Sequence, residues 1–188
     1  MRFTADHAAL LVVDVQGRLM ERIDRRDEVL AAIVLAIRGA QTLGIPVIAT
    51  EQYPKGLGPS VPEVASLVPD RPAKTTFHGG GVREVADSLR SDAIRDVTIV
   101  GIEAHVCVAQ TALELMAMGA RVQVLSDAVG SRHALDREVA LRRIERAGAV
   151  VSTVEAALFE WTESAAHPRF KAISELVKEA DIARSTPK

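Results

Sequence analysis

Three side chains of this sequence are of types that carry out acyl-transfer chemistry, and each one follows a short strand-like run. Asp14 ends LLVVD, Lys74 ends DRPAK, and Cys107, the single cysteine, comes five residues after DVTIVGI. A partly desolvated carboxylate can act as a general base, and a lysine beside it can hold positive charge. A cysteine can attack a carbonyl carbon. Together, the three residue types predict a cysteine nucleophile with its own base and cation.

Each of these residues also has an ordinary structural interpretation. An aspartate after a strand is commonly a turn or cap residue, a lysine is mostly exposed, and a lone cysteine is commonly a small apolar core residue. Cys107 would lie in the first turn of a helix, where backbone N–H groups and the positive end of the helix dipole lower the pKa of a thiol. For a catalytic cysteine, we therefore expect a depressed pKa.

Short aliphatic runs alternate with longer amphipathic stretches along the chain. The strand-like runs are 9–15, 46–50, 96–102, 121–127 and 149–153, with one further short strand near 71–75. The helical patterns are roughly 24–43, 81–91, 106–119, 134–147 and 168–183. Nearly continuous apolar strands that alternate with helices imply βαβ crossovers in a sheet covered on both faces. The pattern predicts a three-layer α/β/α fold with a mainly parallel six-stranded sheet.

The domain organisation follows from the same pattern. A chain of 188 residues suits one domain with a substantial core, so we expect a single domain over 1–188 that ends in a helix and a short polar tail at about 168–188. The segment 51–80 differs from the rest, because it holds five of the eight prolines and is expected to be largely loop.

This loop and the first strand end supply the candidate substrate contacts. Ligands of an open parallel sheet bind beyond the carboxyl ends of its strands. Glu51, Tyr53 and His78 lie in the loop that should line such a site, although His78 is more commonly an ordinary loop histidine. Gln16 follows the first strand and could reach the pocket, with hydrogen bonding inside a turn as an equal alternative.

The composition argues against several classes of function. With 48% hydrophobic and 26% charged residues, the chain is an ordinary globular protein. A formal net charge of −2 and 3% aromatic residues argue against nucleic-acid binding. The apolar run that ends at Asp14 is too short for a signal peptide or a membrane span. We expect a cytoplasmic protein that acts on a small molecule, with neither nucleic acid nor membrane as a partner.

Four stretches of the chain resemble the isochorismatase-like cysteine hydrolase superfamily: VVDVQ, TEQYPKGLG, AKTTF and VGIEAHVCVAQTALELMAMGARVQVLSDAVGSR. The likeness extends over nearly the whole chain, to about residue 160, and TEQYPKGLG with GIEAHVCV is most similar to the isochorismatase-domain-containing subgroup. The resemblance implies a Rossmann-like isochorismatase fold. It also implies assembly into a homo-oligomer, because relatives commonly form one.

The resemblance assigns roles to the three residues. It implies Cys107 as the nucleophile, Asp14 as the general base and Lys74 as the cationic partner of the base. It further implies a cis peptide bond between Ile102 and Glu103, which would turn the Glu103 N–H toward the same point as the Cys107 N–H and form an oxyanion hole. The implied reaction is hydrolysis of a small amide or related carbonyl compound through a thioester on the cysteine.

The sequence departs from two better-known activities of the superfamily. Nicotinamidases of this fold carry an Asp-x-His and further histidines near the second strand, which bind a metal ion. Here Glu51, Gln52 and Tyr53 take that place, and the next histidine is His78. A zinc or iron site needs about three converging ligands, so we expect no metal and no other cofactor. Strict isochorismatases lack the nucleophilic cysteine, whereas this chain has Cys107.

Two other classes of function stay open. A binding or scaffolding protein could keep the fold without turnover, although here the set of aspartate, lysine and cysteine is intact. A redox-responsive protein could use Cys107 as a sensor. The chain has no second cysteine with which this thiol could form an internal disulfide.

Overall fold

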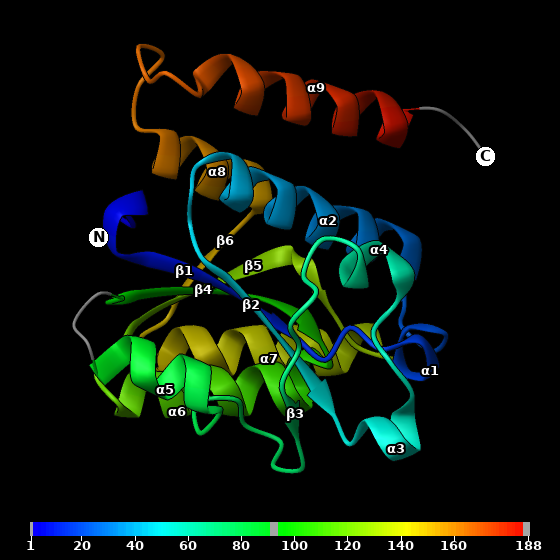
Figure 1. Ribbon diagram of the computed structural model, residues 1–188. Helices are drawn as coiled ribbons and strands as arrows, with labels where there is room; N and C mark the ends of the chain where they lie inside the picture. Colours follow the sequence, from blue (N-terminus) through cyan, green and yellow to red (C-terminus); the bar gives the residue numbers. More distant parts are fainter. Residues whose placement is uncertain (1, 91–93, 186–188) are drawn as a thin grey trace.

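The computed structural model of the chain describes residues 2–90 and 94–185 and is built around one parallel sheet (Figure 1). The six strands follow the order β3-β2-β1-β4-β5-β6, and every neighbouring pair is parallel. The strands are β1 (Ala8–Val13), β2 (Val47–Gln52), β3 (Ala73–Lys74), β4 (Asp96–Ile102), β5 (Arg121–Gly130) and β6 (Val150–Ser152). The predicted six-stranded α/β architecture is confirmed.

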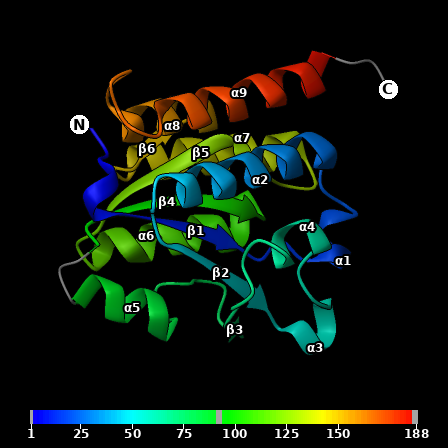
Figure 2. The same cartoon turned by 45° about the horizontal axis from the view of Figure 1, so that its top comes forward.

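Helices cover both faces of the sheet (Figures 1 and 2). One face carries α2 (Arg26–Thr42) and α8 (Val154–Thr162), with α9 (Phe170–Ser185) packed outside them on α2 and α8. The other face carries α5 (Arg83–Arg90), α6 (Ala109–Ala117) and α7 (Ala134–Arg146). The C-terminal helix therefore adds to the outer surface of one helical layer.

The side chains of the central strand β1 pack against both helical layers. Successive side chains of a strand point to opposite faces. Leu10 and Val12 belong to the core shared with α2 and α8, whereas Leu11 and Val13 belong to the core shared with α6 and α7. All six residues of β1 are buried. The strand is apolar along its whole length because neither of its faces meets water.

The order of the strands reverses between β1 and β4. From β1 the chain moves outward to β2 and β3, and then returns to β4 on the other side of β1. Open α/β sheets bind ligands beyond the carboxyl ends of the strands at such a reversal. Asp14 directly follows β1 and Glu103 directly follows β4. Residues singled out in the sequence therefore lie at the expected position for a binding crevice.

The segment 51–80 is more regular than the predicted loop. It contains the two-residue strand β3 and the single-turn helices α3 (Pro54–Leu57) and α4 (Pro62–Ala65). Each of these helices begins with a proline, whose fixed φ suits the first helical position, where the missing N–H costs nothing. Two of the five prolines that indicated a loop, Pro54 and Pro62, therefore start short helices.

Other boundaries differ by a few residues. The predicted helix 106–119 starts as a π-helical turn, η2 (Ala104–Val108), and continues as α6. Two short elements lie near the amino terminus, η1 (Ala5–His7) and α1 (Gly17–Met20). Residue 91 of the predicted helix 81–91 and residues 186–188 of the predicted tail lie outside the described residues.

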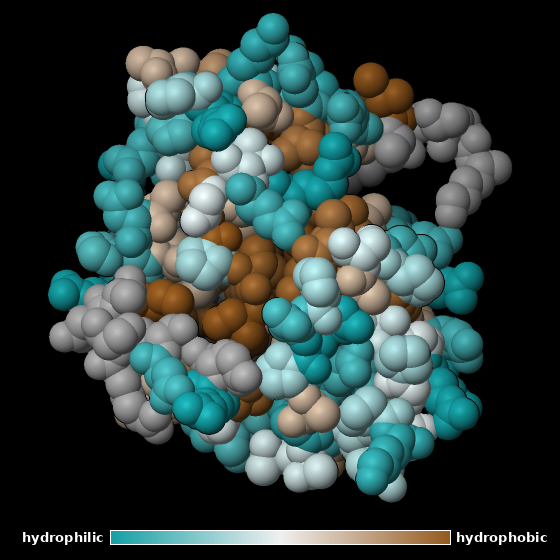
Figure 3. Space-filling model, viewed as in Figure 1, coloured by the Kyte–Doolittle hydropathy of each residue, from teal (hydrophilic) through white to brown (hydrophobic). Residues whose placement is uncertain are grey.

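One edge of the sheet is only partly covered. β3 pairs only with Glu51 and Gln52, so within the described chain the rest of β2 has no partner strand on that side. Val47 and Ile48, in this part of β2, are half-buried. Figure 3 views this face, and apolar surface gathers near its middle, between the two helical layers. Among residues 2–90 and 94–185, no helix has the length and apolar character of a membrane span.

Candidate active site

Asp14 lies directly beyond the end of β1, and its side chain is fully enclosed. The residue adopts the left-handed conformation, with φ 52°, and has an exposed fraction of 0%. Thr50 Oγ1 donates a hydrogen bond to Asp14 Oδ1 at 2.8 Å, and Lys74 Nζ donates to Oδ2 at 2.6 Å. Both bonds stabilise the ionised carboxylate, which is the form that a general base needs.

The ammonium group of Lys74 is surrounded by acceptors from the protein. Besides Asp14, Nζ donates to Gln52 Oε1 at 2.7 Å, and to the carbonyl oxygens of Thr76 and Phe77 at 3.2 and 3.4 Å. An ammonium group has only three hydrogens, so these acceptors occupy all of them. Lys74 therefore supplies positive charge to Asp14 and has no spare donor for a substrate.

Cys107 lies in the π-helical turn η2, is 5% exposed, and is close enough to the Asp14 carboxylate for its charge to act on the thiol. Burial raises the pKa of the Cys107 thiol from 9.0 to about 12, the negative charge of Asp14 adds to this rise, and Lys74 opposes it. The expectation of a depressed pKa is therefore wrong. The helix start that was expected to acidify the thiol is buried, and it faces a carboxylate.

The ends of β1 and β4 approach each other closely at Gly101. This glycine has φ 126°, and a Cβ atom placed on it would lie 2.1 Å from the backbone oxygen of Val13. No other residue fits this conformation and this contact. The close approach brings the turn after β4, which carries Cys107, beside Asp14. The peptide bond between Ile102 and Glu103 at the start of that turn is cis.

Two of the predicted substrate contacts form hydrogen bonds within the protein instead. Gln16 is fully buried, and its Nε2 donates to the carbonyl oxygens of Gln52 and Gly58 at 3.0 and 2.6 Å. The Glu51 carboxylate accepts hydrogen bonds from Ser60 N, Ser60 Oγ and Arg71 Nε at 2.9, 2.8 and 3.0 Å. The Gln16 side chain therefore neither lines the hollow beside β3 nor bonds within its own turn, because its partners belong to the end of β2 and the loop after it, and Glu51 likewise holds the loop.

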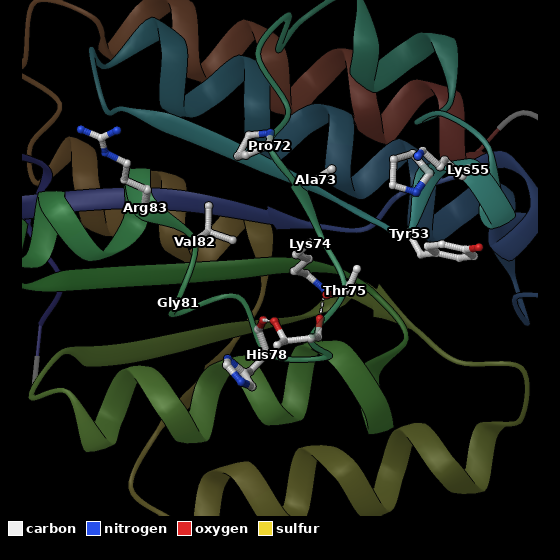
Figure 4. A pocket seen from close by; sticks show the side chains of 12 residues that line it. Tyr53, Lys55, Pro72, Ala73, Lys74, Thr75, His78, Gly81, Val82 and Arg83 are labelled. Atoms are coloured by element: carbon white, nitrogen blue, oxygen red, sulfur yellow. Dashed lines mark hydrogen bonds between the residues drawn. The ribbon is translucent and has the colours of Figure 1, made fainter.

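The other two predicted contacts, Tyr53 and His78, line a hollow of about 650 Å³ along the outer side of β3. Figure 4 shows Tyr53 near one end of the hollow and Lys74 extending from β3 in its wall. Asp14 and Cys107 do not line it. The hollow adjoins the aspartate and the cysteine through Lys74.

His78 belongs to a segment that is fastened to α6. Its Nδ1 lies 2.6 Å from Glu114 Oε2, without the alignment of a hydrogen bond. Gly80 N donates to the same carboxylate oxygen at 2.9 Å, and Gly79 N donates to Thr111 Oγ1 at 2.9 Å. The glycine-rich stretch after Lys74 is thus held against the helix that follows the cysteine.

Two residues of the site were not singled out by sequence reasoning. Thr50 and Gln52 lie on alternate positions of β2 and hydrogen-bond to Asp14 and Lys74 respectively. The sequence signal that could have identified them is their position at the end of an apolar strand that pairs with β1. Among the described residues, no group of three or more His, Cys, Asp or Glu side chains is arranged to hold a metal ion.

A family model for the isochorismatase domain matches residues 8–156. The chain belongs to the isochorismatase family. The matched part of this isochorismatase domain contains β1 to β6, and with them Asp14, Lys74 and Cys107.

Known proteins resemble this isochorismatase domain over most of its length. Isochorismatase domain-containing protein 2 of Pongo abelii is 39% identical over 171 residues, which are 90% of this chain and 82% of that protein. A solved structure described as the MAR1 ribonuclease of Caenorhabditis elegans is 37% identical, with a TM-score of 0.89. The match covers 100% of this chain and 95% of the nematode chain. The Escherichia coli YcaC gene product, described as an octameric hydrolase of unknown specificity, shares the fold at 23% identity, with a TM-score of 0.82 and coverage of 97% and 98%.

Proposed function

We propose that this isochorismatase-family protein is a cysteine-dependent hydrolase of small amides or related carbonyl compounds and needs no metal ion. The observation that carries the proposal is the position of the Asp14 carboxylate, which is hydrogen-bonded to the Lys74 ammonium and lies near enough to the Cys107 thiol to act on its charge. A nucleophile, a base bonded to it and a third group that orients the base are the parts of a covalent catalytic set.

The high pKa of the thiol determines how the attack begins. With a pKa of about 12, Cys107 is a thiol at neutral pH. Its proton passes to Asp14 as Sγ attacks the carbonyl carbon of the substrate, so the thiolate is not a resting species. The carbonyl oxygen becomes an oxyanion, for which the N–H groups of Glu103 and Cys107 are the proposed donors.

The remaining steps return every group to its starting state. Asp14 gives the proton to the leaving nitrogen, the C–N bond breaks, and an acyl thioester stays on Cys107. A water molecule then loses a proton to Asp14 and attacks the thioester carbon. The C–S bond breaks, the thiol regains its proton, and a carboxylic acid is released. Lys74 keeps its charge beside Asp14 throughout.

The chemistry of the donors near the second strand favours the metal-independent form of this reaction. Glu51 stands at the place in the sequence where the resemblance puts the metal ligands of nicotinamidases, and its Oε1 is held by Ser60 and Arg71. Those hydrogen bonds outweigh the effect of burial and hold the pKa of Glu51 below its ordinary value of 4.5.

RNA cleavage is a second candidate function, because the nematode neighbour is described as a ribonuclease. Burial argues against it, since Asp14 is 0% and Cys107 5% exposed, and a polymer phosphate would have to reach both. The net charge of −2 also gives the chain little attraction for RNA. A binding protein without turnover is the third candidate.

Steady-state assays separate these candidates. We expect the wild-type protein to hydrolyse members of a panel of small primary amides and their matched p-nitrophenyl esters. Cys107→Ala and Asp14→Asn should each lose at least about 1,000-fold in kcat, because both belong to one catalytic unit. Cleavage of RNA that is lost in Cys107→Ala would contradict the proposal, as would binding of panel compounds without any turnover.

We also propose that the protein assembles into a homo-oligomer. Leu135 and Val139, one turn apart on α7, are 67% and 51% exposed, and contact with a second copy would remove both from water. Light scattering coupled to gel filtration tests this, and a mass equal to one chain would contradict it.

A further inference from the structure

Gln52 is a buried residue whose four polar groups are all hydrogen-bonded. It is the last residue of β2 and is 7% exposed. Its backbone N donates to Gln16 Oε1 at 2.8 Å, and its backbone oxygen accepts from Gln16 Nε2 at 3.0 Å. Its side chain accepts from Lys74 Nζ at 2.7 Å and donates to the Thr75 oxygen at 3.0 Å. Both hydrogen bonds of this side chain are therefore with Lys74 or with the residue that follows it.

These contacts close a ring that includes the proposed base. Asp14 is joined to Gln16 through Val15, Gln16 holds the backbone of Gln52, Gln52 holds Lys74, and Lys74 returns to Asp14. Polar networks of this kind, when every member is satisfied, make a buried site rigid. The ring ties the direction of the Lys74 ammonium to the strand that carries Asp14.

The chemical type of Gln52 also matters. A lysine ammonium sits on a flexible four-carbon stem, and its acceptors decide where its hydrogens point. The neutral amide oxygen of Gln52 takes one hydrogen without adding negative charge, so Asp14 is the carboxylate to which Lys74 donates. A carboxylate at position 52 would compete with Asp14 for the same positive charge.

We propose that Gln52 is a positioning residue, which aims the Lys74 ammonium at Asp14 and so fixes the carboxylate that receives the Cys107 proton. The role rests on the proposed hydrolase function, and Gln52 itself touches no reacting atom. The same side chain also fixes the start of the segment after β3, because Gln52 Nε2 holds the Thr75 oxygen while Lys74 holds the oxygens of Thr76 and Phe77.

The test uses Gln52→Met, which keeps the length of the side chain and removes both of its hydrogen-bonding groups. On a panel substrate that the wild type hydrolyses, kcat should fall about 10- to 100-fold while KM changes less than about threefold. A displaced base slows the chemical step and leaves substrate binding largely unchanged.

Gln123→Met is the matched control. Gln123 lies on β5, is 1% exposed, accepts a hydrogen bond from Thr98 on β4, and is far from the carboxyl ends of the strands. Its kcat should stay within about twofold of wild type, as expected away from the site.

Gln52→Glu separates positioning from a merely structural role, because only a positioning role predicts a shift in the pH profile of kcat/KM. The variant restores an acceptor for Lys74, so its kcat should exceed that of Gln52→Met. The added carboxylate competes for the Lys74 charge, so the acid limb of the pH profile of kcat/KM should move to higher pH. A profile that coincides with wild type would overturn the proposal, as would a kcat for Gln52→Met equal to that of the Gln123→Met control.

Alkylation of Cys107 by iodoacetamide tests the same role without turnover. Gln52→Met no longer holds Lys74 near the thiol, and Gln52→Glu adds a negative charge that offsets Lys74. Cys107 should therefore react at least about threefold more slowly at pH 8.5 in both variants than in wild type, because thiolate content sets the rate. If wild type hydrolyses nothing while alkylation still depends on Gln52, the hydrolase function fails and the positioning role stands. If alkylation is unaffected in both variants, the positioning role fails.

Discussion

Lys74 Nζ lies 2.6 Å from Asp14 Oδ2, and the two side chains are 4% and 0% exposed. The lysine comes from the edge strand β3 and the aspartate follows the central strand β1, so their contact spans β2 at the carboxyl ends of all three strands. Removing two charges from water costs several kcal/mol for each ion, and their attraction and further hydrogen bonds offset this cost. The pair therefore makes a charged base available inside an apolar core.

Replacing Lys74 with methionine should strongly destabilise the protein. The substitution leaves the Asp14 carboxylate buried without its cation, and we expect the free energy of unfolding at pH 7 to fall by about 3–5 kcal/mol in urea denaturation. Lys171→Met is the control, because Lys171 Nζ lies 4.0 Å from Glu175 and its side chain is 90% exposed. A loss no larger than that of the control would contradict the buried pair.

The raised pKa of Cys107 makes stability depend on alkaline pH. The folded thiol has a pKa of about 12 against an ordinary value of 9.0, so the folded state holds this proton more tightly than the unfolded state. The resulting stability is complete below pH 9 and is lost between about pH 9 and 12, at about 1.4 kcal/mol for each pH unit. Urea denaturation of wild type and Cys107→Ala from pH 8 to 10.5 measures this. Parallel curves for the two proteins would show that the pKa is not raised.

Asp14→Asn should make Cys107 more reactive toward iodoacetamide while abolishing hydrolysis. The Asp14 carboxylate raises the pKa of the thiol, and its removal leaves Lys74 to lower that pKa. Alkylation at pH 8 should quicken by roughly tenfold for each unit by which the pKa falls. The single cysteine makes the measurement unambiguous by mass spectrometry. Slower alkylation in the variant would mean that Asp14 activates the resting thiol instead of restraining it.

Glu51 and Tyr53 should differ in their effect on substrate binding. Glu51→Gln loses its charged bond to Arg71 and leaves KM within about threefold of wild type, because the side chain serves the loop and not the hollow. Tyr53→Leu removes a 53% exposed ring that lines the hollow and should raise KM about tenfold, the effect of losing roughly 1.4 kcal/mol of binding. Michaelis–Menten analysis of both variants on one substrate provides the comparison. A larger rise in KM for Glu51→Gln would reverse the two assignments.

Gly101→Ala should disturb the approach of β1 to β4. The added methyl would meet the Val13 oxygen at 2.1 Å, in a backbone conformation that alanine avoids, and we expect a loss of about 2–5 kcal/mol in the free energy of unfolding. Gly17→Ala is the control, since a Cβ there meets nothing within 4 Å. Equal melting temperatures for the two variants would contradict the close contact.

The parts of the fold that were predictable are those whose signal is local. The β1 run from Ala8 to Val13 is apolar throughout because both its faces are buried, and this pattern alone indicates a covered parallel strand. β3 is only two residues long, so it has almost no periodicity of its own, and the sequence indicated only one short strand near 71–75.

The site was less predictable, because its chemistry depends on contacts between distant segments. The pKa of Cys107 could not be read from a helix start, since burial and Asp14 act against the helix dipole there. Glu51 and Gln52 are neighbours in the sequence, and both are polar residues that could belong to the site. Successive side chains of β2 point to opposite sides, however, and of the two only Gln52 hydrogen-bonds to Lys74. Register within the sheet, which no local pattern supplies, separates the two.

The most direct test of the central claim is the mass of the protein during turnover. Wild type mixed with a reactive p-nitrophenyl ester and quenched in acid should gain the mass of one acyl group, and peptide analysis should find that group on Cys107. Hydroxylamine should remove it, as expected for a thioester, and Cys107→Ala should gain nothing. Turnover of the substrate with the mass of Cys107 unchanged at every quench time, or an acyl group that also forms on Cys107→Ala, would contradict a cysteine nucleophile.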